Sequence, residues 1–127
     1  MIRRGEVYWL PIRGARGHEQ EGLRPAVVIQ NDRGNDSAES TIVALMTSRV
    51  PQRIYPMHVV VGPDETGIEG QSTILLEQIQ TVDVSRLRQR TGMLRPQTME
   101  QVDRALHRSL GIIFCPASSA IKSGVEG

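Results

Sequence analysis

Residues 17–30 read GHEQEGLRPAVVIQ, a charged segment followed by an apolar one. Glycines flank a charged segment, Arg24 follows that segment, and Pro25–Gln30 is a short apolar run. An apolar run of this length next to turn residues is typical of a fully buried strand. We therefore expect a long loop over residues 13–23 that leads into a buried strand, with Arg24 at the mouth of that strand.

Further strands are predicted on both sides of this one. Strand formers or apolar runs lie at Glu6–Ile12, Thr41–Thr47, His58–Val61, Ser72–Gln80 and Arg88–Gly92. Pro11 is suited only to an edge or an end of its strand. Asn31–Asp36 and Gly62–Asp64 carry the small polar residues, glycine or proline of turns.

A helix is predicted after the last strand. Its apolar stripe recurs at spacings of three and four residues through Met99, Val102, Leu106, Leu110 and Ile113. Pro96 fits the first helical position, although the residue before it, Arg95, is a poor N-cap. Short strands followed by one helix predict an α+β fold, a small barrel-like antiparallel sheet with a C-terminal helix.

Length and composition limit the class of protein. The chain has 127 residues, of which we assign 1–114 to one domain and 115–127 to a disordered tail. Cys115 is the single cysteine, and the three histidines lie far apart in sequence, so we expect no disulfide, no metal site and no cofactor. The apolar runs are much shorter than the ~20 residues of a membrane helix. We expect a cytoplasmic protein with no membrane association.

Charge is segregated along the chain. The net charge is +1, but residues 54–83 carry −5, whereas residues 84–108 carry six arginines against two acids, a net +4. Fourteen of the fifteen basic residues are arginine, whose rigid fork of donors suits phosphate. Codon bias and a solvated surface explain the same preference equally well. Arg86, Arg88 and Arg90 would share one face if their segment were extended.

Four segments, in order, resemble the MazF/PemK family of toxin endoribonucleases. They are RGEVY at residues 4–8, GHEQEGLRP at 17–25, MTS at 46–48 and STILLEQIQT at 72–81, and the final helix follows them. The resemblance covers nearly all of residues 3–113. It implies an SH3-like toxin barrel, a homodimer, a cognate acidic antitoxin, and sequence-specific, metal-independent cleavage of single-stranded mRNA.

The resemblance also implies roles for individual residues. In that family the RNA 2′-hydroxyl attacks the phosphate and leaves a 2′,3′-cyclic phosphate and a 5′-hydroxyl. Arg24, Thr47 and Glu19 are the implied catalytic residues: Arg24 supplies charge, Thr47 orients a group by hydrogen bonding, and Glu19 is a base or a positioning carboxylate. The implied RNA-binding residues are Gln20, His18, Ser48, Gln78 and Arg86.

Two alternatives and one departure stay open at this point. A gyrase-poisoning toxin of the same fold, or a non-catalytic RNA-binding module, would need no pairing of Arg24 with Thr47. His18 stands where the family usually has serine. It either fills the place of the serine or adds a proton carrier that titrates near neutrality.

Overall fold

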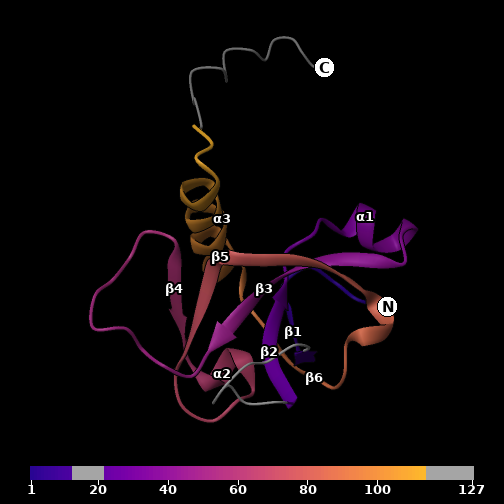
Figure 1. The fold of residues 1–127 in the computed structure, drawn as a ribbon, viewed down its shortest axis with the longest axis horizontal. Helices are drawn as coiled ribbons and strands as arrows, with labels where there is room; N and C mark the ends of the chain where they lie inside the picture. Colours follow the sequence, from indigo (N-terminus) through magenta and orange to yellow (C-terminus); the bar gives the residue numbers. More distant parts are fainter. Residues whose placement is uncertain (13–21, 114–127) are drawn as a thin grey trace.

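An antiparallel sheet that curls into a half barrel forms the body of this protein (Figure 1). The computed structural model describes residues 1–12 and 22–113. In that part of the chain, the strands are β1 (Glu6–Ile12), β2 (Gly22–Val28), β3 (Ser40–Thr47), β4 (His58–Val61), β5 (Ser72–Asp83) and β6 (Arg90–Met93). They lie in the order β4-β5-β3-β2-β1-β6. The helices are α1 (Asp32–Ser37), α2 (Pro63–Thr66) and α3 (Pro96–Leu110), with a 3₁₀ turn, η1, at Val84–Arg86.

The central strands are apolar on both faces because both faces are covered. Ala26, Val27 and Val28 of β2 are fully buried, as expected for a strand that lies in the interior of a sheet. Val27 belongs to the core cluster beneath α3, whereas Ala26 and Val28 belong to a second cluster with Leu10. The predicted buried strand is therefore confirmed, although it begins at Gly22 and ends at Val28.

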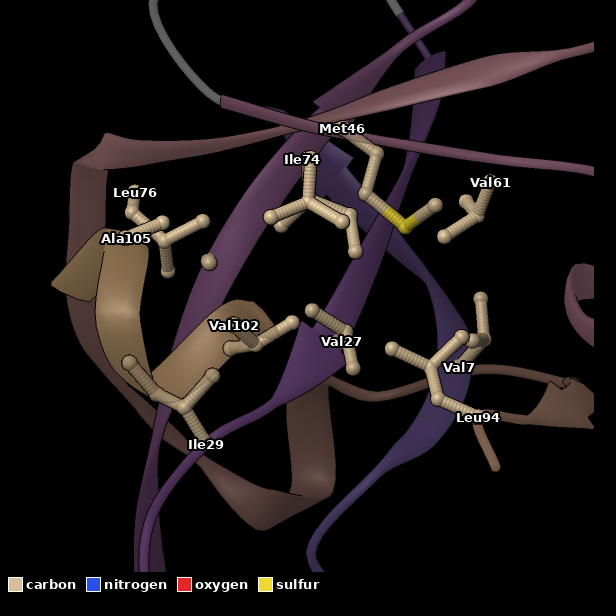
Figure 2. Close-up of a cluster of buried hydrophobic side chains, with 12 residues drawn as sticks. Val7, Val27, Ile29, Met46, Val61, Ile74, Leu76, Leu94, Val102 and Ala105 are labelled. Carbon is tan, nitrogen blue, oxygen red and sulfur yellow. The ribbon is translucent and has the colours of Figure 1, made fainter. Parts of the chain in front are cut away.

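The C-terminal helix packs on the sheet across β4 and β5 (Figure 1). Figure 2 shows Val102 and Ala105 of α3 within the cluster of side chains that includes Val27, Ile74 and Leu76. The Ser109 hydroxyl also donates to the Leu76 carbonyl at 2.7 Å. This packing confirms the predicted α+β arrangement of a curled sheet with a terminal helix.

The helix ends earlier than its apolar stripe predicts. Gly111 adopts φ +74°, and Ile112 N–H donates to the His107 carbonyl at 2.9 Å, so the chain leaves the helix after Leu110. A left-handed glycine at this position is a common helix terminator. Ile113 consequently lies outside α3 and is 89% exposed, which corrects its assignment to the stripe.

Two predicted turns are short helices. Asn31 caps α1, since its side chain accepts from Gly34 N–H at 2.8 Å. The same residue types that favour turns also favour helix N-caps, so the sequence pattern does not separate the two. At α2 the N-cap is Gly62, which provides no side-chain cap, and Pro63 occupies the first turn, where its missing N–H costs nothing.

The last two strands also differ from their predicted bounds. β5 continues to Asp83, whose side chain caps η1 by accepting from Ser85 N–H at 3.0 Å. β6 is Arg90–Met93, two residues later than its predicted start, because η1 and the segment after it occupy residues 84–89. β1 has the predicted bounds, and Pro11 lies near its end, beyond the residues that pair with β6.

Candidate active site

A cavity of about 370 Å³ opens where β2 begins and β3 ends. Strands β1, β2 and β3 contribute most of its wall. Ser48 directly after β3, Ile68 between α2 and β5, and Ser72 at the start of β5 contribute the rest. Its lining residues are Trp9, Ile12, Leu23, Arg24, Pro25, Met46, Thr47, Ser48, Ile68 and Ser72. The structure thus brings Arg24, Thr47 and Ser48 together, as the resemblance implies.

Arg24 is held in place by the backbone of the neighbouring strand. The β2–β3 register pairs Ala26 with Leu45. Arg24 and Thr47 each lie two residues beyond this last pair, and both line the cavity. The Arg24 guanidinium donates through Nη2 to the Met46 carbonyl at 3.0 Å. This bond fixes the side chain but leaves most of its N–H donors for another acceptor.

Within residues 1–12 and 22–113, no carboxylate forms an ion pair with Arg24. The ion-paired arginines of this part of the chain are Arg3, Arg4, Arg90 and Arg95. Arg24 is half-buried in a partly apolar cavity, where a charge attracts an anion more strongly than it does in bulk water. Its guanidinium is therefore suited to bind a phosphate group.

Thr47 is the last residue of β3, and its side chain forms a hydrogen bond with the backbone of Arg49. Its Oγ1 accepts from Arg49 N–H at 3.3 Å. The hydroxyl of Thr73, the β5 partner of Thr47, donates to the Arg49 carbonyl at 2.9 Å. Arg49 is exposed beside the cavity, and in the part of the chain that the structure describes its side chain has no ion-pair partner. Sequence reasoning missed Arg49, although its position two residues after Thr47 would have indicated it.

Gln78 and Arg86 lie outside the cavity lining. Gln78 is exposed at a bulge in β5, because pairing with β3 jumps from Ile79 to Leu75. Arg86 donates through Nη2 to the Pro11 carbonyl at 2.6 Å, at the end of β1 that leads to the cavity. Arg86 is thus bonded to the residue before the cavity-lining Ile12, whereas Gln78 lies at the β5 bulge.

The three alternating arginines do not form one stripe. Arg86 ends the 3₁₀ turn η1, and Arg88 donates to the Ser85 and Arg86 carbonyls at 3.1 Å. Arg90 donates to Glu6 Oε2 at 2.8 Å, and Glu6 is only 7% exposed. Because the segment turns instead of staying extended, the condition under which these three arginines would share one face is not met.

The loop residues His18, Glu19 and Gln20 lie outside the described residues. The described residues on either side of them, Ile12 and Gly22, pair in the β1–β2 hairpin, and both Ile12 and Leu23 line the cavity. The roles implied for these three residues stay predictions.

Trp9, Ile68 and Ser72 are site residues that sequence reasoning missed. Trp9 pairs with Pro25 in the β1–β2 hairpin, so the predicted hairpin would have indicated it. Ile68 and Ser72 approach the cavity only because β5 pairs with β3, Thr73 opposite Thr47. Nothing local in the sequence signals that pairing.

The remaining candidate features are structural. Both oxygens of the Glu77 carboxylate lie 3.1 Å from His58 Nε2, and the ring of Tyr55 meets that imidazole edge to face. No three His, Cys, Asp or Glu side chains gather as metal ligands in residues 1–12 and 22–113. The helices described here include none with the length and apolar character needed to cross a membrane.

Chemically, the cavity combines one fixed cation with hydroxyl groups and apolar walls. Such a site binds an anionic ester: the guanidinium holds the phosphate, the hydroxyls donate or accept, and the walls contact an uncharged group. A phosphodiester within a nucleic acid meets this description.

Comparison with known proteins adds to this geometry. Residues 3–110 match the family described as the PemK-like, MazF-like toxin of type II toxin–antitoxin systems. A mycobacterial endoribonuclease, solved in complex with its cognate antitoxin, superposes with a TM-score of 0.75 at 23% identity, over 91% of this chain and all of that one. At 23% identity, this superposition shows that the two proteins share a fold.

Structures from Deinococcus radiodurans are also similar. Its MazF superposes with a TM-score of 0.68 at 27% identity, over 87% of this chain and 97% of that one. A chain of a MazE–MazF structure from the same organism superposes with a TM-score of 0.69 at 26% identity, over 88% of this chain and 97% of that one. These proteins share the curled sheet and terminal helix described above.

Proposed function

Because the chain belongs to the PemK-like, MazF-like family of toxins of type II toxin–antitoxin systems, we propose that it cleaves RNA in the cavity around Arg24 and Thr47. The similar mycobacterial protein is an endoribonuclease, which supports the same activity here. The proposed substrate is single-stranded mRNA, cut at preferred sequences in the cytoplasm.

One observation carries the proposal. Arg24 and Thr47 are far apart in sequence but line the same cavity, and the Met46 carbonyl holds the guanidinium at 3.0 Å. A toxin that only bound gyrase, or a module that only bound RNA, would not require this pairing of a fixed cation with a hydroxyl.

The proposed chemistry needs no group outside the chain and the RNA. The 2′-oxygen attacks phosphorus and loses its proton, while the bond from phosphorus to the 5′-oxygen breaks and that oxygen gains a proton. Arg24 stabilises the charge that develops on the non-bridging oxygens, where a preorganised donor is most effective. Thr47 orients the phosphate or the 2′-hydroxyl, and Glu19 is the base or a positioning carboxylate.

The other proposed contacts surround this centre. Gln20, His18, Ser48 and Arg86 bind RNA at the cavity or at its rim, and Gln78 contacts RNA further along the strand. We also propose that the chain forms a homodimer and is neutralised by a cognate acidic antitoxin. The MazE–MazF structures of the similar Deinococcus protein support such a partner.

The first prediction tests Arg24. Incubating the protein with a mixed RNA pool and sequencing the new 5′ ends should reveal cleavage at preferred sites. Arg24→Ala should lower the cleavage rate about 10²–10³-fold and leave RNA affinity nearly unchanged, since the charge matters most in the transition state. Cleavage should persist in EDTA and be absent on all-deoxy oligonucleotides, which lack the nucleophile.

Arg33→Ala is the matched control. Arg33 is exposed on α1, away from the cavity lining, and its loss should leave cleavage unchanged. Full activity in Arg24→Ala, sensitivity to the chelator, or binding of the pool without new 5′ ends would each contradict the proposal.

A further inference from the structure

Trp9 is the single tryptophan of the chain, and it forms part of the cavity wall beside Arg24. Its backbone is fixed on both sides. Trp9 pairs with Pro25 of β2, its N–H donates to the Gln89 carbonyl at 3.2 Å, and its carbonyl accepts from Arg88 N–H at 2.8 Å. The position from which the indole projects is therefore set by the sheet and not by a mobile loop.

The cavity has two chemically different parts. Trp9, Ile12, Leu23, Pro25 and Ile68 supply an apolar wall. The polar part consists of the Arg24 guanidinium and the hydroxyl-bearing residues Thr47, Ser48 and Ser72. Phosphate chemistry alone needs only the polar part.

The apolar wall has the size and character of a site for a flat, uncharged group. The volume of about 370 Å³ lies within the ~300–1,000 Å³ of small-ligand pockets, which combine apolar walls with a few polar groups. A nucleobase adjoining a bound phosphate is such a group. Aromatic side chains bind bases of single-stranded nucleic acids by stacking, and this works for every base because every base has a π face.

We propose that this cavity is a nucleobase subsite, in which the indole of Trp9 stacks on the base next to the phosphate bound by Arg24. The subsite rests on the proposed function, since it assumes that RNA is the ligand. Serine and threonine hydroxyls can donate or accept, so Ser48 and Ser72 would contact the edge of the base without selecting strongly for one base.

Intrinsic fluorescence tests the subsite in the unmodified protein, because all tryptophan emission comes from Trp9. The probe is a mixed-sequence deoxyhexanucleotide, which lacks the 2′-hydroxyl and therefore persists. Its control is a hexamer of the same backbone in which every position is abasic. We expect the base-bearing hexamer to quench Trp9 emission in a saturable way. The abasic hexamer should cause no quenching, even at concentrations at which fluorescence anisotropy shows that the abasic hexamer is bound.

Substitution at Trp9 provides a second measurement. Trp9→Leu should weaken binding of a labelled base-bearing hexamer about 5- to 100-fold, the range expected for one lost stacking contact. Trp9→Phe keeps an aromatic face and should retain most of the affinity. Both variants should bind the abasic hexamer like the unmodified protein. Thermal unfolding establishes whether each variant is folded. Should Trp9→Leu fail to fold, the fluorescence experiment on the unmodified protein tests the subsite by itself.

Three results would overturn the subsite: equal quenching by both hexamers, hexamer binding without any change in Trp9 emission, or no binding of the base-bearing hexamer. The proposed function fails separately, on RNA cleavage and on Arg24→Ala. A protein that cleaves RNA without a fluorescence response loses the subsite only, whereas one that is quenched but does not cleave RNA loses the proposed function only.

Discussion

Arginine side chains that look equivalent in the sequence have different environments in the structure. Arg24 donates to the Met46 carbonyl and Arg86 to the Pro11 carbonyl, and neither forms an ion pair within residues 1–12 and 22–113. Arg90 instead neutralises the buried Glu6, and Arg4 donates to Asp103 at 2.5 Å across the fold. A count of basic residues therefore overstates the charge that is available to a nucleic acid. Of these four, Arg24 is the one that lines the cavity.

Tyr8 shows how one of these ion pairs affects a neighbour. Its hydroxyl donates to Glu6 Oε1 at 2.9 Å, and Arg90 binds the other carboxylate oxygen. Burial raises the pKa of Tyr8 from an ordinary value near 10 to about 12, and the hydrogen bond and the charge of Glu6 add to this, whereas Arg90 opposes it. The folded state thus holds the phenolic proton more tightly than the unfolded chain does.

The second prediction follows from that difference. The stabilisation by Tyr8 is fully present below pH 10 and is lost as pH rises from about 10 to about 12, because the unfolded chain releases its proton first. Tyr8→Phe should lower the free energy of unfolding by about 1.5–3 kcal/mol at pH 7 through the lost hydrogen bond to a carboxylate. Urea unfolding from pH 7 to 12 should show this difference shrinking above pH 10. A difference that stays constant to pH 12 would contradict the prediction.

At the scale of elements, α2 supplies the cap that the start of α3 lacks. Arg95 precedes α3 without a side-chain cap of its own. Glu65 of α2 accepts from Arg95 N–H at 2.8 Å and from the Thr98 hydroxyl at 3.0 Å. Asp64 pairs with the Arg95 guanidinium, and that hydrogen bond holds the pKa of Asp64 below its usual range. Two carboxylates thus sit near the positive end of the α3 dipole.

The third prediction concerns this cap. Glu65→Ala should lower the free energy of unfolding by about 2–4 kcal/mol, since the Arg95 N–H and the Thr98 hydroxyl each lose a hydrogen bond to this buried carboxylate. Glu69→Ala is the control: Glu69 is exposed, and its loss should change stability by less than about 0.5 kcal/mol. Chemical denaturation followed by circular dichroism measures both. Equal stabilities of the two variants would show that Glu65 is not the cap.

Sequence patterns predicted elements better than they predicted contacts between elements. The apolar runs located the strands because the central strands are buried on both faces, as Val27 and Val43 show. The short α1 was missed because part of what stabilises it is tertiary: the buried Asn35 amide accepts from Thr41 at 2.7 Å and donates to the Gln30 carbonyl.

The same limit applies to the candidate site. The spacing of motifs indicated Arg24 and Thr47, which the structure brings to one cavity. Ile68 and Ser72 depend on the pairing of β5 with β3, a long-range contact that no local pattern carries. Gln78 belongs to a motif in sequence but lies at the β5 bulge, away from the cavity.

Over the whole molecule, opposite charges separated in sequence meet across the fold. The acidic segment 54–83 contributes Asp64 and Glu65 to Arg95 of the basic segment 84–108. Ion pairs within the fold therefore neutralise part of the positive charge of residues 84–108. A partner that competes with RNA has to bind the remaining cations near the cavity, as an acidic antitoxin segment with apolar anchors would do.

The last prediction concerns residues beyond α3. The family match ends at residue 110, Gly111 terminates the helix, and residues 116–127 carry no apolar periodicity. Truncation after Cys115 should therefore keep RNA cleavage and antitoxin affinity within about tenfold, or ~1.4 kcal/mol, of the full chain. Truncation after Arg104 is the contrasting control. It removes Ala105, which is 3% exposed, and the bond from Ser109 to Leu76, and should cost about 3 kcal/mol of stability or more. A loss beyond tenfold in the first truncation would assign the tail a part in catalysis or inhibition.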